Sequence, residues 1–443
     1  MYQSYVSPIN SRYKSQFMSK IWSPNNKILT MRQLWVDLAQ SQLDLGVKEI
    51  KKEHIQEMTQ QMDHIDHDKI NEYESRFKHD IMAHIYAFGD LCPNAKKIIH
   101  LGATSNFIND NVDMILIKES LCNIIKLLFQ TNKIIKQKAF EYINVPTLAY
   151  THLQPAQLIT VGKRFAMWGS DIIMDFNNMV SLIKKLPFRG VKGTVGSEDT
   201  LLKLFDGDTI KCDMLNAKLS EKYDFNNRVI VCGQTYSRKN DVDVIHSLSS
   251  LCQSIYKIMN DIRLLSGKSE IYEDFQKEQI GSSAMPYKMN PITCEKICSL
   301  SRLVMNYETD IVQTYINQWL ERTLDDSAIK RVIIPDCFML VEHILTEMNN
   351  CLQTLYINRE QIDKNVEEHM PKILSEQIIL CGVKLGYDRQ DIHERLRVLF
   401  LHKKNFSEDE IIQKILDTYE ISMDPNKYVG RCEHQVKAFY KSH

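Results

Sequence analysis

The chain has 443 residues, with 55 Lys and Arg against 56 Asp and Glu and therefore a formal net charge of −1. This balance argues against a nucleic-acid-binding protein held by a basic face, and the 44% apolar and 25% charged residues exclude wholesale disorder. With 15 glycines and 11 prolines, the chain holds about half the average share of these turn-forming residues, which favours a mostly helical protein of two or three domains over a sandwich or barrel.

The N-terminal segment MYQSYVSPINSRYKSQF has polar residues where a signal peptide requires an apolar stretch. No uncharged apolar run in the sequence approaches the roughly 18 residues that a membrane-spanning helix needs. The eleven cysteines are scattered from Cys92 to Cys432 without a CxxC pair, and neither a disulfide framework nor a zinc ribbon fits this scatter. We therefore expect a soluble, cytoplasmic protein with buried, reduced thiols.

The first clear helix is predicted to begin near Thr30, which has capping-box spacing to Gln33 and precedes apolar residues at helical intervals. Gly46 stands where a left-handed C-terminal cap is expected. Short helices and loops are predicted to fill the chain from there to about residue 104.

Two long stripes of apolar residues follow, at 114–128 and 244–265, with steps of three and four residues. The second stripe has three heptads and ends at Ser266-Gly267. A third helix is predicted to begin after Asn290-Pro291, with Asn290 as its N-cap. Long helices with such seams are typical of a helical bundle, whose seams pack either within one subunit or between subunits.

The last part of the chain has shorter periodic segments. Ser407 and Glu410 have capping-box spacing, and Met370-Pro371 and Asp424-Pro425 mark predicted breaks. We therefore predict an all-α protein with three helical domains, the central one a bundle of long helices. Their predicted ranges are 1–104, 105–357 and 358–443.

A polar loop between two of the long helices, KEQIGSSAMPYKMNP at residues 277–291, has a composition that suits anion binding. Its Gly-Ser-Ser turn offers backbone N–H groups and hydroxyls, and Lys288 adds a positive charge. These donors fit a bound carboxylate or a developing oxyanion. On composition alone, a structural loop remains an equally good interpretation.

Part of this loop, GSSAMPYKMNP, resembles GSSxMPxKxNP, the signature of the fumarase/aspartase superfamily. Seven further segments resemble the adenylosuccinate lyases of that superfamily, so that the likeness covers nearly the whole chain. They are SPINSRY, FKHDIMAH, IHLGATSNFINDN, THLQPAQLITVGKR, FRGVKGTVG, CGQTYSRK and ERTLDDSAIKR. The resemblance implies the helical-bundle fold of that superfamily, a homotetramer with active sites shared between subunits, and no metal or organic cofactor.

The implied reaction is a β-elimination across a C–N bond. It releases fumarate from adenylosuccinate to give AMP, and from succinyl-aminoimidazole-carboxamide ribotide in purine nucleotide biosynthesis. One proton leaves the carbon beside a carboxylate while the nitrogen departs on the opposite face, so the reaction needs a general base and a general acid. The carbanion, held as a doubly charged carboxylate, needs clustered donors and cations.

The resemblance implies a catalytic role for five residues. Ser282 matches the general base and His152 the general acid, and a neutral-range pKa suits histidine to that role. Glu295 would orient His152, as carboxylates orient histidines elsewhere. His79 would contact the substrate near the reacting end. Lys288 would bind the fumaryl carboxylates and help to stabilise the Ser282 alkoxide.

A second set of residues is implied in substrate binding. Arg12 and Tyr13 match the pair that holds the ribotide phosphate, together with Arg322, Ser327 and Arg331, and the forked guanidinium suits this task. The other implied substrate-binding residues are Lys78, Asp80, Thr104, Ser105, Gln234, Asn290 and Lys296.

The chain departs from the family pattern at three positions where arginine is usual. Lys78 and Lys296 keep the charge but lose the bidentate fork, and Met289 removes the charge. None of the three is part of the acid–base pair. We therefore expect altered substrate binding with retained chemistry.

Two alternatives have other implications. An argininosuccinate lyase would share the signature loop, but only a phosphorylated substrate requires the pair Arg12 and Tyr13. A helical scaffold that has lost catalysis would have no need of Ser282, His152 and Lys288 together.

Overall fold

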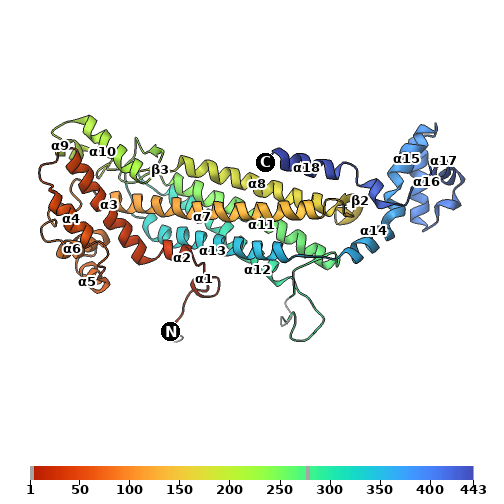
Figure 1. Cartoon of the computed structure of the whole chain (residues 1–443), viewed down its shortest axis with the longest axis horizontal. Helices are drawn as coiled ribbons and strands as arrows, with labels where there is room; N and C mark the ends of the chain where they lie inside the picture. Colours follow the sequence, from red (N-terminus) through yellow and green to blue (C-terminus); the bar gives the residue numbers. More distant parts are fainter. Residues whose placement is uncertain (1–3, 276–279, 443) are drawn as a thin grey trace. The chain divides into compact units, whose positions relative to one another are not determined.

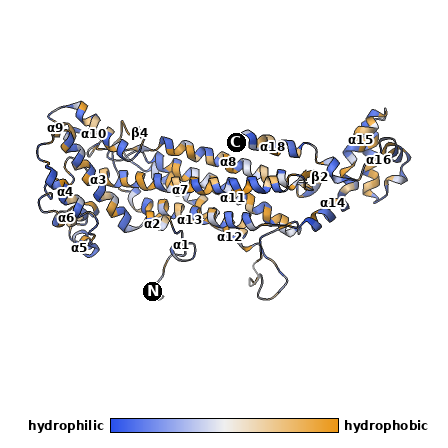
Figure 2. Ribbon diagram, viewed as in Figure 1, coloured by the Kyte–Doolittle hydropathy of each residue, from blue (hydrophilic) through white to orange (hydrophobic). Residues whose placement is uncertain are grey.

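The computed structural model describes residues 4–275 and 280–442 (Figure 1). Within these ranges the chain is mostly α-helical, with three sheets of two short strands each, so the prediction of an all-α fold is confirmed. Figure 2 shows apolar and polar residues interspersed along the long helices. No helix in the described ranges is long and apolar enough to cross a membrane.

The chain divides into two compact units, each assembled from three segments. The first unit comprises Met1–Phe129, Met174–Tyr256 and Ile297–Glu347, and the second comprises Gln130–Ile173, Lys257–Lys296 and Met348–His443. The division into three consecutive domains stays a prediction.

Five long helices contribute one part to each unit. They are α7 (Ser105–Glu141), α8 (Val161–Lys185), α11 (Lys239–Gly267), α12 (Ile292–Ile316) and α13 (Asp326–Thr354). The predicted seam of α11 is buried in the single chain: Val244, Leu248 and Leu251 each have 0% exposure. This seam therefore packs within the subunit, where burial of each such side chain contributes about 1.5–3 kcal/mol.

Apart from α3, which has 21 residues, the remaining elements of the first unit are short. They are α1 (Pro8–Ser11), α2 (Met18–Ile21), α3 (Pro24–Asp44), α4 (Lys52–Gln60), α5 (His67–Phe77), α6 (Asp80–Leu91), β3 (Pro187–Phe188), α9 (Asp199–Leu204), α10 (Thr209–Lys222) and β4 (Asn227–Arg228). Strands β3 and β4 pair in parallel.

The second unit adds two antiparallel pairs, β1 with β2 and β5 with β6, and a set of C-terminal helices. Its elements are β1 (Pro146–Thr151), β2 (Gln154–Thr160), β5 (Ile271–Tyr272), β6 (Tyr356–Ile357), α14 (Arg359–Ile373), α15 (Ser375–Lys384), α16 (Arg389–Leu401), η1 (Phe406–Glu408), α17 (Glu410–Tyr419), η2 (Pro425–Tyr428) and α18 (Cys432–Ser442).

The first helix begins earlier than predicted. Helix α3 starts at Pro24, and the Ser23 hydroxyl accepts a hydrogen bond from the N–H of Asn26. Pro24 needs no hydrogen-bond partner in the first turn, which makes Ser-Pro the stronger start signal. The hydroxyl of Thr30 donates to the carbonyl of Asn26 one turn back, so it is no cap. Gly46 has the predicted left-handed backbone, with φ of +90°.

Three further local predictions are wrong. Asp409, rather than Ser407, caps α17 and accepts from the N–H groups of Ile411 and Ile412. Pro371 lies inside α14, which continues for two more residues to Ile373. Helix α12 does begin directly after Asn290-Pro291, but the Asn290 side chain does not cap it and donates instead to the carbonyl of Gly281.

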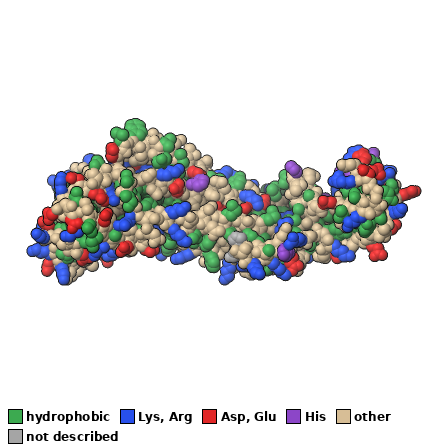
Figure 3. Space-filling view, turned by 90° about the horizontal axis from the view of Figure 1, so that it is seen from above, with side chains coloured by type: hydrophobic (Ala, Val, Ile, Leu, Met, Phe, Trp, Pro, Cys, Tyr) green, Lys and Arg blue, Asp and Glu red, His purple; other side chains and the backbone are tan. Residues whose placement is uncertain are grey.

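Side chains of both charges are intermixed on the face seen in Figure 3. This distribution agrees with the formal net charge of −1. None of the eleven cysteines forms a disulfide, and most of them are buried.

Candidate active site

His152 lies at the tip of the hairpin formed by β1 and β2. Thr151 pairs with Gln154 across the hairpin, so His152 and Leu153 alone form the turn. Their φ angles are +54° and +60°, as a two-residue turn of the favoured hairpin type requires. This left-handed backbone costs a residue with a side chain about 1–2 kcal/mol. The hairpin thus holds an exposed histidine in a strained turn.

The buried carboxylate of Glu270 anchors this hairpin. Glu270 is 1% exposed and accepts hydrogen bonds from the Tyr150 hydroxyl over 2.5 Å and from Asn365 over 2.9 Å. Arg164, from α8, lies 4.0 Å from the same carboxylate and donates to the carbonyl of Leu148. Burial and the hydrogen bond to Glu270 raise the pKa of Tyr150, so its hydroxyl remains a donor at neutral pH.

Ser282 lies in the loop that precedes α12, with two backbone N–H groups directed at its side chain. Its Oγ accepts hydrogen bonds from the N–H of Met285 over 3.1 Å and from the N–H of Ala284 over 3.3 Å. Donors of this kind stabilise negative charge on an oxygen. The Ser282 side chain is half-buried, and these two N–H groups would favour negative charge on its oxygen.

Within the described part of this loop, Gly281 lies close to Lys288 and Asn290. The Asn290 amide donates to the carbonyl of Gly281 over 2.8 Å. A Cβ at position 281 would lie 2.0 Å from the carbonyl oxygen of Lys288, so only glycine fits there. The side chain of Lys288 is exposed. The first residues of the predicted loop, 277–279, lie outside the described residues.

Glu295 and Lys296 are in the first turns of α12. The Glu295 carboxylate is half-exposed and lies 3.9 Å from the guanidinium of Arg263. In the described part of the chain, no hydrogen bond joins Glu295 to His152. The orientation of His152 by Glu295 stays a prediction.

In the first unit, three predicted residues are consecutive at the junction of α5 and α6. Lys78 ends α5 in a left-handed conformation, with φ of +53°. His79 caps α6, and its Nδ1 accepts from the N–H of Met82 over 3.3 Å, which places the proton of the neutral ring on Nε2. Asp80 accepts a hydrogen bond from Arg331 over 2.6 Å.

A cavity of about 250 Å³ in the first unit brings together Arg322, Ser327 and Arg331, three of the predicted phosphate-binding residues. They lie at and just before the first turns of α13. Lys27, Arg238 and Lys330 also line the cavity, beside Asp110, Asp113 and Asp326, so five cations face one space with three carboxylates. This arrangement suits an anionic ligand such as a phosphate.

A buried network of charges supports the wall of this cavity. Asp326, which is 1% exposed, accepts from Arg238 Nε over 2.6 Å and from Arg322 Nη1 over 2.7 Å. Arg238 also donates to Asp110 over 2.9 Å. Burial alone would lower the pKa of Arg238, but Asp110 and the other anions outweigh it and raise the pKa. Two arginines from distant segments are thereby fixed to one carboxylate.

Gln234 is held at the N-terminus of α7. The Asn106 side chain donates a hydrogen bond to the Gln234 side-chain oxygen over 3.1 Å. Asn106 is the next residue in the sequence after Thr104 and Ser105. The structure thus brings Gln234 to the start of the helix that Ser105 begins. N–H groups at such a helix start favour an anion.

Arg12 and Tyr13 follow the short helix α1. Arg12 is exposed, and Tyr13 is half-buried with its ring 5.6 Å from that of His343. Both residues belong to the first unit, as do Lys78, His79, Asp80, Thr104, Ser105, Gln234, Arg322, Ser327 and Arg331. The second unit contains His152, Ser282, Lys288, Asn290, Glu295 and Lys296.

Sequence reasoning missed most of the residues that line the cavity, among them Lys27, Asn106, Arg238 and Lys330. The last three lie inside segments that carry the family resemblance, so their polarity was an available signal. Lys27 lies in the first turns of α3 and had no such signal.

A family model described as lyase matches residues 9–306 of the chain. The chain is 38% identical to an adenylosuccinate lyase of Saccharomyces cerevisiae, over 99% of this chain and 94% of that one. It is also 38% identical to an adenylosuccinate lyase of Schistosoma mansoni, with the same coverage.

Among solved structures, the chain is similar to a fumarate lyase from Mesorhizobium sp. BNC1, with a TM-score of 0.85, 18% identity and full coverage of both chains. A 3-carboxy-cis,cis-muconate lactonizing enzyme from Pseudomonas putida gives a TM-score of 0.84 at 19% identity over 99% of both chains. At these identities the likeness shows the shared fold.

Proposed function

Because this chain belongs to the adenylosuccinate lyase family, we propose that it eliminates fumarate from adenylosuccinate to give AMP. The second proposed substrate is succinyl-aminoimidazole-carboxamide ribotide, of purine nucleotide biosynthesis. The observation that carries the proposal is the 38% identity to adenylosuccinate lyases over 99% of the chain. The elimination needs a general acid and a general base, and binding of the phosphorylated substrate needs an anion-binding cavity.

The proposed general base is Ser282. A serine hydroxyl is a weak base, so the alkoxide must be stabilised by its surroundings. The N–H groups of Ala284 and Met285, both directed at Oγ, support this role. Lys288 and Asn290 in the same loop would bind the fumaryl carboxylates.

The proposed general acid is His152, which would donate its proton to the departing nitrogen. Its position at the tip of an anchored hairpin supports this role, because a general acid must be held in a defined position within reach of the substrate. Glu295 would orient it, and His79, with its proton on Nε2, would donate to the substrate near the reacting end.

The cavity lined by Arg322, Ser327 and Arg331 is the proposed phosphate site, together with Arg12 and Tyr13. Thr104, Ser105 and Gln234 would contact the succinyl group at the start of α7. Lys78, Asp80 and Lys296 complete the proposed set. The chemistry uses proton transfer and charge stabilisation by these side chains, and the proposal includes no metal or organic cofactor.

We also propose a homotetramer with active sites shared between subunits. Met167 and Met174 support a subunit contact, because they lie seven residues apart on α8 and are 51% and 63% exposed. The proposed acid His152 and base Ser282 belong to the second unit, whereas the proposed phosphate-binding arginines belong to the first. A cytoplasmic location agrees with eleven cysteines that form no disulfide.

The test is to incubate the purified protein with adenylosuccinate and to measure fumarate and AMP. Argininosuccinate is run in parallel, and Ser282→Ala and His152→Ala serve as catalytic variants. We expect fumarate and AMP from the wild type and near-complete loss of kcat in both variants. Turnover of argininosuccinate alone would refute the substrate, and no turnover of either would refute the proposed function.

A further inference from the structure

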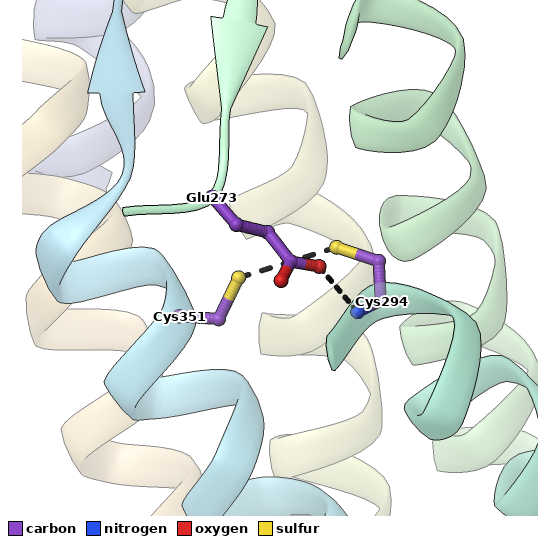
Figure 4. Close-up of side chains that lie close together, drawn as sticks. All are labelled: Glu273, Cys294 and Cys351. Carbon is purple, nitrogen blue, oxygen red and sulfur yellow. Dashed lines mark hydrogen bonds between the residues drawn. The ribbon is translucent and has the colours of Figure 1, made fainter. Parts of the chain in front are cut away.

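Three potential metal ligands from distant positions in the sequence meet in the second unit (Figure 4). Glu273 follows β5, Cys294 is in the first turn of α12, and Cys351 is in the last turn of α13. One ligand atom from each lies within 4.8 Å of the others. Their exposures are 8%, 0% and 6%, so the group is buried.

Strand pairing brings the three residues together. Ile271 pairs with Ile357 and Tyr272 with Tyr356, so the chain just before Glu273 is fixed beside the end of α13. The Glu273 carboxylate then accepts hydrogen bonds from the N–H of Thr293 over 3.0 Å and from the N–H of Cys294 over 2.6 Å. It therefore caps α12 in place of the predicted Asn290.

The distance between the two sulfur atoms suits a shared metal ion. The Sγ atoms of Cys294 and Cys351 are 4.0 Å apart. Two Zn–S bonds of about 2.3 Å at a tetrahedral angle place the sulfurs about 3.8 Å apart. A disulfide requires about 2.0 Å, so the thiols would have to move much further to form one.

Glu273 has room for a metal despite its two hydrogen bonds. A carboxylate offers about four lone-pair sites, and the two N–H groups occupy only two of them. The N-terminus of α12 also carries partial positive charge, which offsets part of the negative charge of two thiolates and a carboxylate.

We propose that Glu273, Cys294 and Cys351 form a binding site for one thiophilic divalent cation, Zn²⁺ or Cd²⁺, with solvent as the fourth ligand. The ion binds both sulfurs as thiolates and releases their two protons to solvent. It ties the first turn of α12 to the last turn of α13. This site is independent of the proposed lyase function, and its test measures binding rather than turnover.

Without a cation, the Cys294 thiol is held in its protonated form. The hydrogen bond with Cys351, burial and the Glu273 carboxylate together raise the pKa of Cys294. Because the thiolate is the form that reacts with oxidants, the Cys294 thiol resists oxidation. A bound ion is what makes the two thiolates stable side by side.

The test titrates the full-length, reduced and chelator-treated protein with Cd²⁺ and follows the cadmium–thiolate charge-transfer absorption. We expect saturation at one Cd²⁺ per chain, together with a rise in melting temperature. Cys294→Ser and Cys351→Ser should each abolish both effects. Glu273→Gln, which keeps a carbonyl oxygen for the helix cap, should weaken binding by tenfold or more.

Cys298→Ser is the matched control. Cys298 is one turn further along α12 and equally buried, and its thiol donates to the carbonyl of Tyr256, so its loss should leave Cd²⁺ binding unchanged. Circular dichroism checks that each variant is folded. Absence of a saturable thiolate band in the wild type, or a band that survives in both ligand variants, overturns the proposal. A disulfide between Cys294 and Cys351 in the isolated protein overturns it as well.

Discussion

Arg331 donates a hydrogen bond from Nη2 to Oδ2 of Asp80 over 2.6 Å, which joins two residues 251 positions apart. Asp80 also accepts the N–H of Ile81 through its other oxygen. Burial on its own would raise the pKa of Asp80, but the Ile81 N–H and the Arg331 guanidinium outweigh it and lower the pKa below its ordinary value. The ion pair thus orients one of the proposed phosphate-binding arginines.

We expect Asp80→Asn to reduce the free energy of unfolding at neutral pH by about 0.5–1 kcal/mol, because the partly exposed pair is lost while the hydrogen bond to Ile81 is kept. The pKa of Asp80 is depressed in the folded state, so its stabilising effect is present above the unfolded pKa and disappears as the pH falls through the folded pKa. Urea unfolding at pH 7 and at progressively lower pH checks this. A difference that stays constant down to the lowest pH would contradict the ion-pair explanation.

Substitution of Asp326 is expected to destabilise the protein far more than substitution of Asp80. Asp326 is 1% exposed and holds both Arg238 and Arg322. Asp326→Asn removes one of the two carboxylates that face the buried guanidinium of Arg238, so we expect a loss of about 3 kcal/mol in stability. In protein that remains folded, KM should rise more than kcat falls, because Arg322 loses its orientation.

The neighbouring Asp325 provides the control, because it is exposed. Asp325→Asn should change neither the unfolding curve nor KM. Equal effects of the two substitutions would show that the network around Asp326 does not orient Arg322.

The overall helical pattern could be predicted from the sequence because it depends on a repeated local signal. The seam of α11 recurs every three or four residues, and its end at Gly267 is as predicted. The first residue of each helix was harder to predict, since several polar residues near a helix boundary can act as the N-cap. Thr30 and Ser407 have suitable spacing, but Ser23 and Asp409 are the residues that accept the N–H groups.

The candidate site was predictable where a long motif carried it. The segments around Ser282 and His152 have specific sequences, whereas the strained turn at His152 depends on strand register that composition does not reveal. The cap that Glu273 provides for α12 links residues about twenty positions apart. Such tertiary contacts leave no periodic signal, which is why Asn290 was predicted as the cap.

The N–H of Ala284 offers a direct test of the Ser282 environment. Ala284→Pro removes this donor, so the Ser282 alkoxide loses one of two hydrogen bonds and kcat should fall by about 10²-fold. Ala284→Gly keeps the N–H and should retain most of the activity. Steady-state rates of fumarate release distinguish them, and similar rates for the two variants would be evidence against stabilisation by this N–H.

The hairpin tip makes a prediction about stability. Leu153 has φ of +60°, so Leu153→Gly should relieve strain and raise the free energy of unfolding by about 1 kcal/mol. Gln154→Gly, in the adjoining strand, should instead lower it by about 0.5–1 kcal/mol. Thermal melting of both variants checks the signs, and destabilisation by Leu153→Gly would contradict the strain argument.

Subunit assembly is best tested on α8 rather than on α11. The heptad seam of α11 is a plausible interface from sequence, but Leu251 is completely buried in the single chain, so Leu251→Asp should unfold the protein and not merely separate subunits. Met174 is 63% exposed in the single chain, so a neighbouring subunit could cover it. We expect Met174→Asp to keep the helical circular dichroism spectrum while light scattering detects smaller assemblies and activity falls, since the proposed sites are shared. An active tetramer carrying Met174→Asp would exclude this face of α8 as a subunit contact.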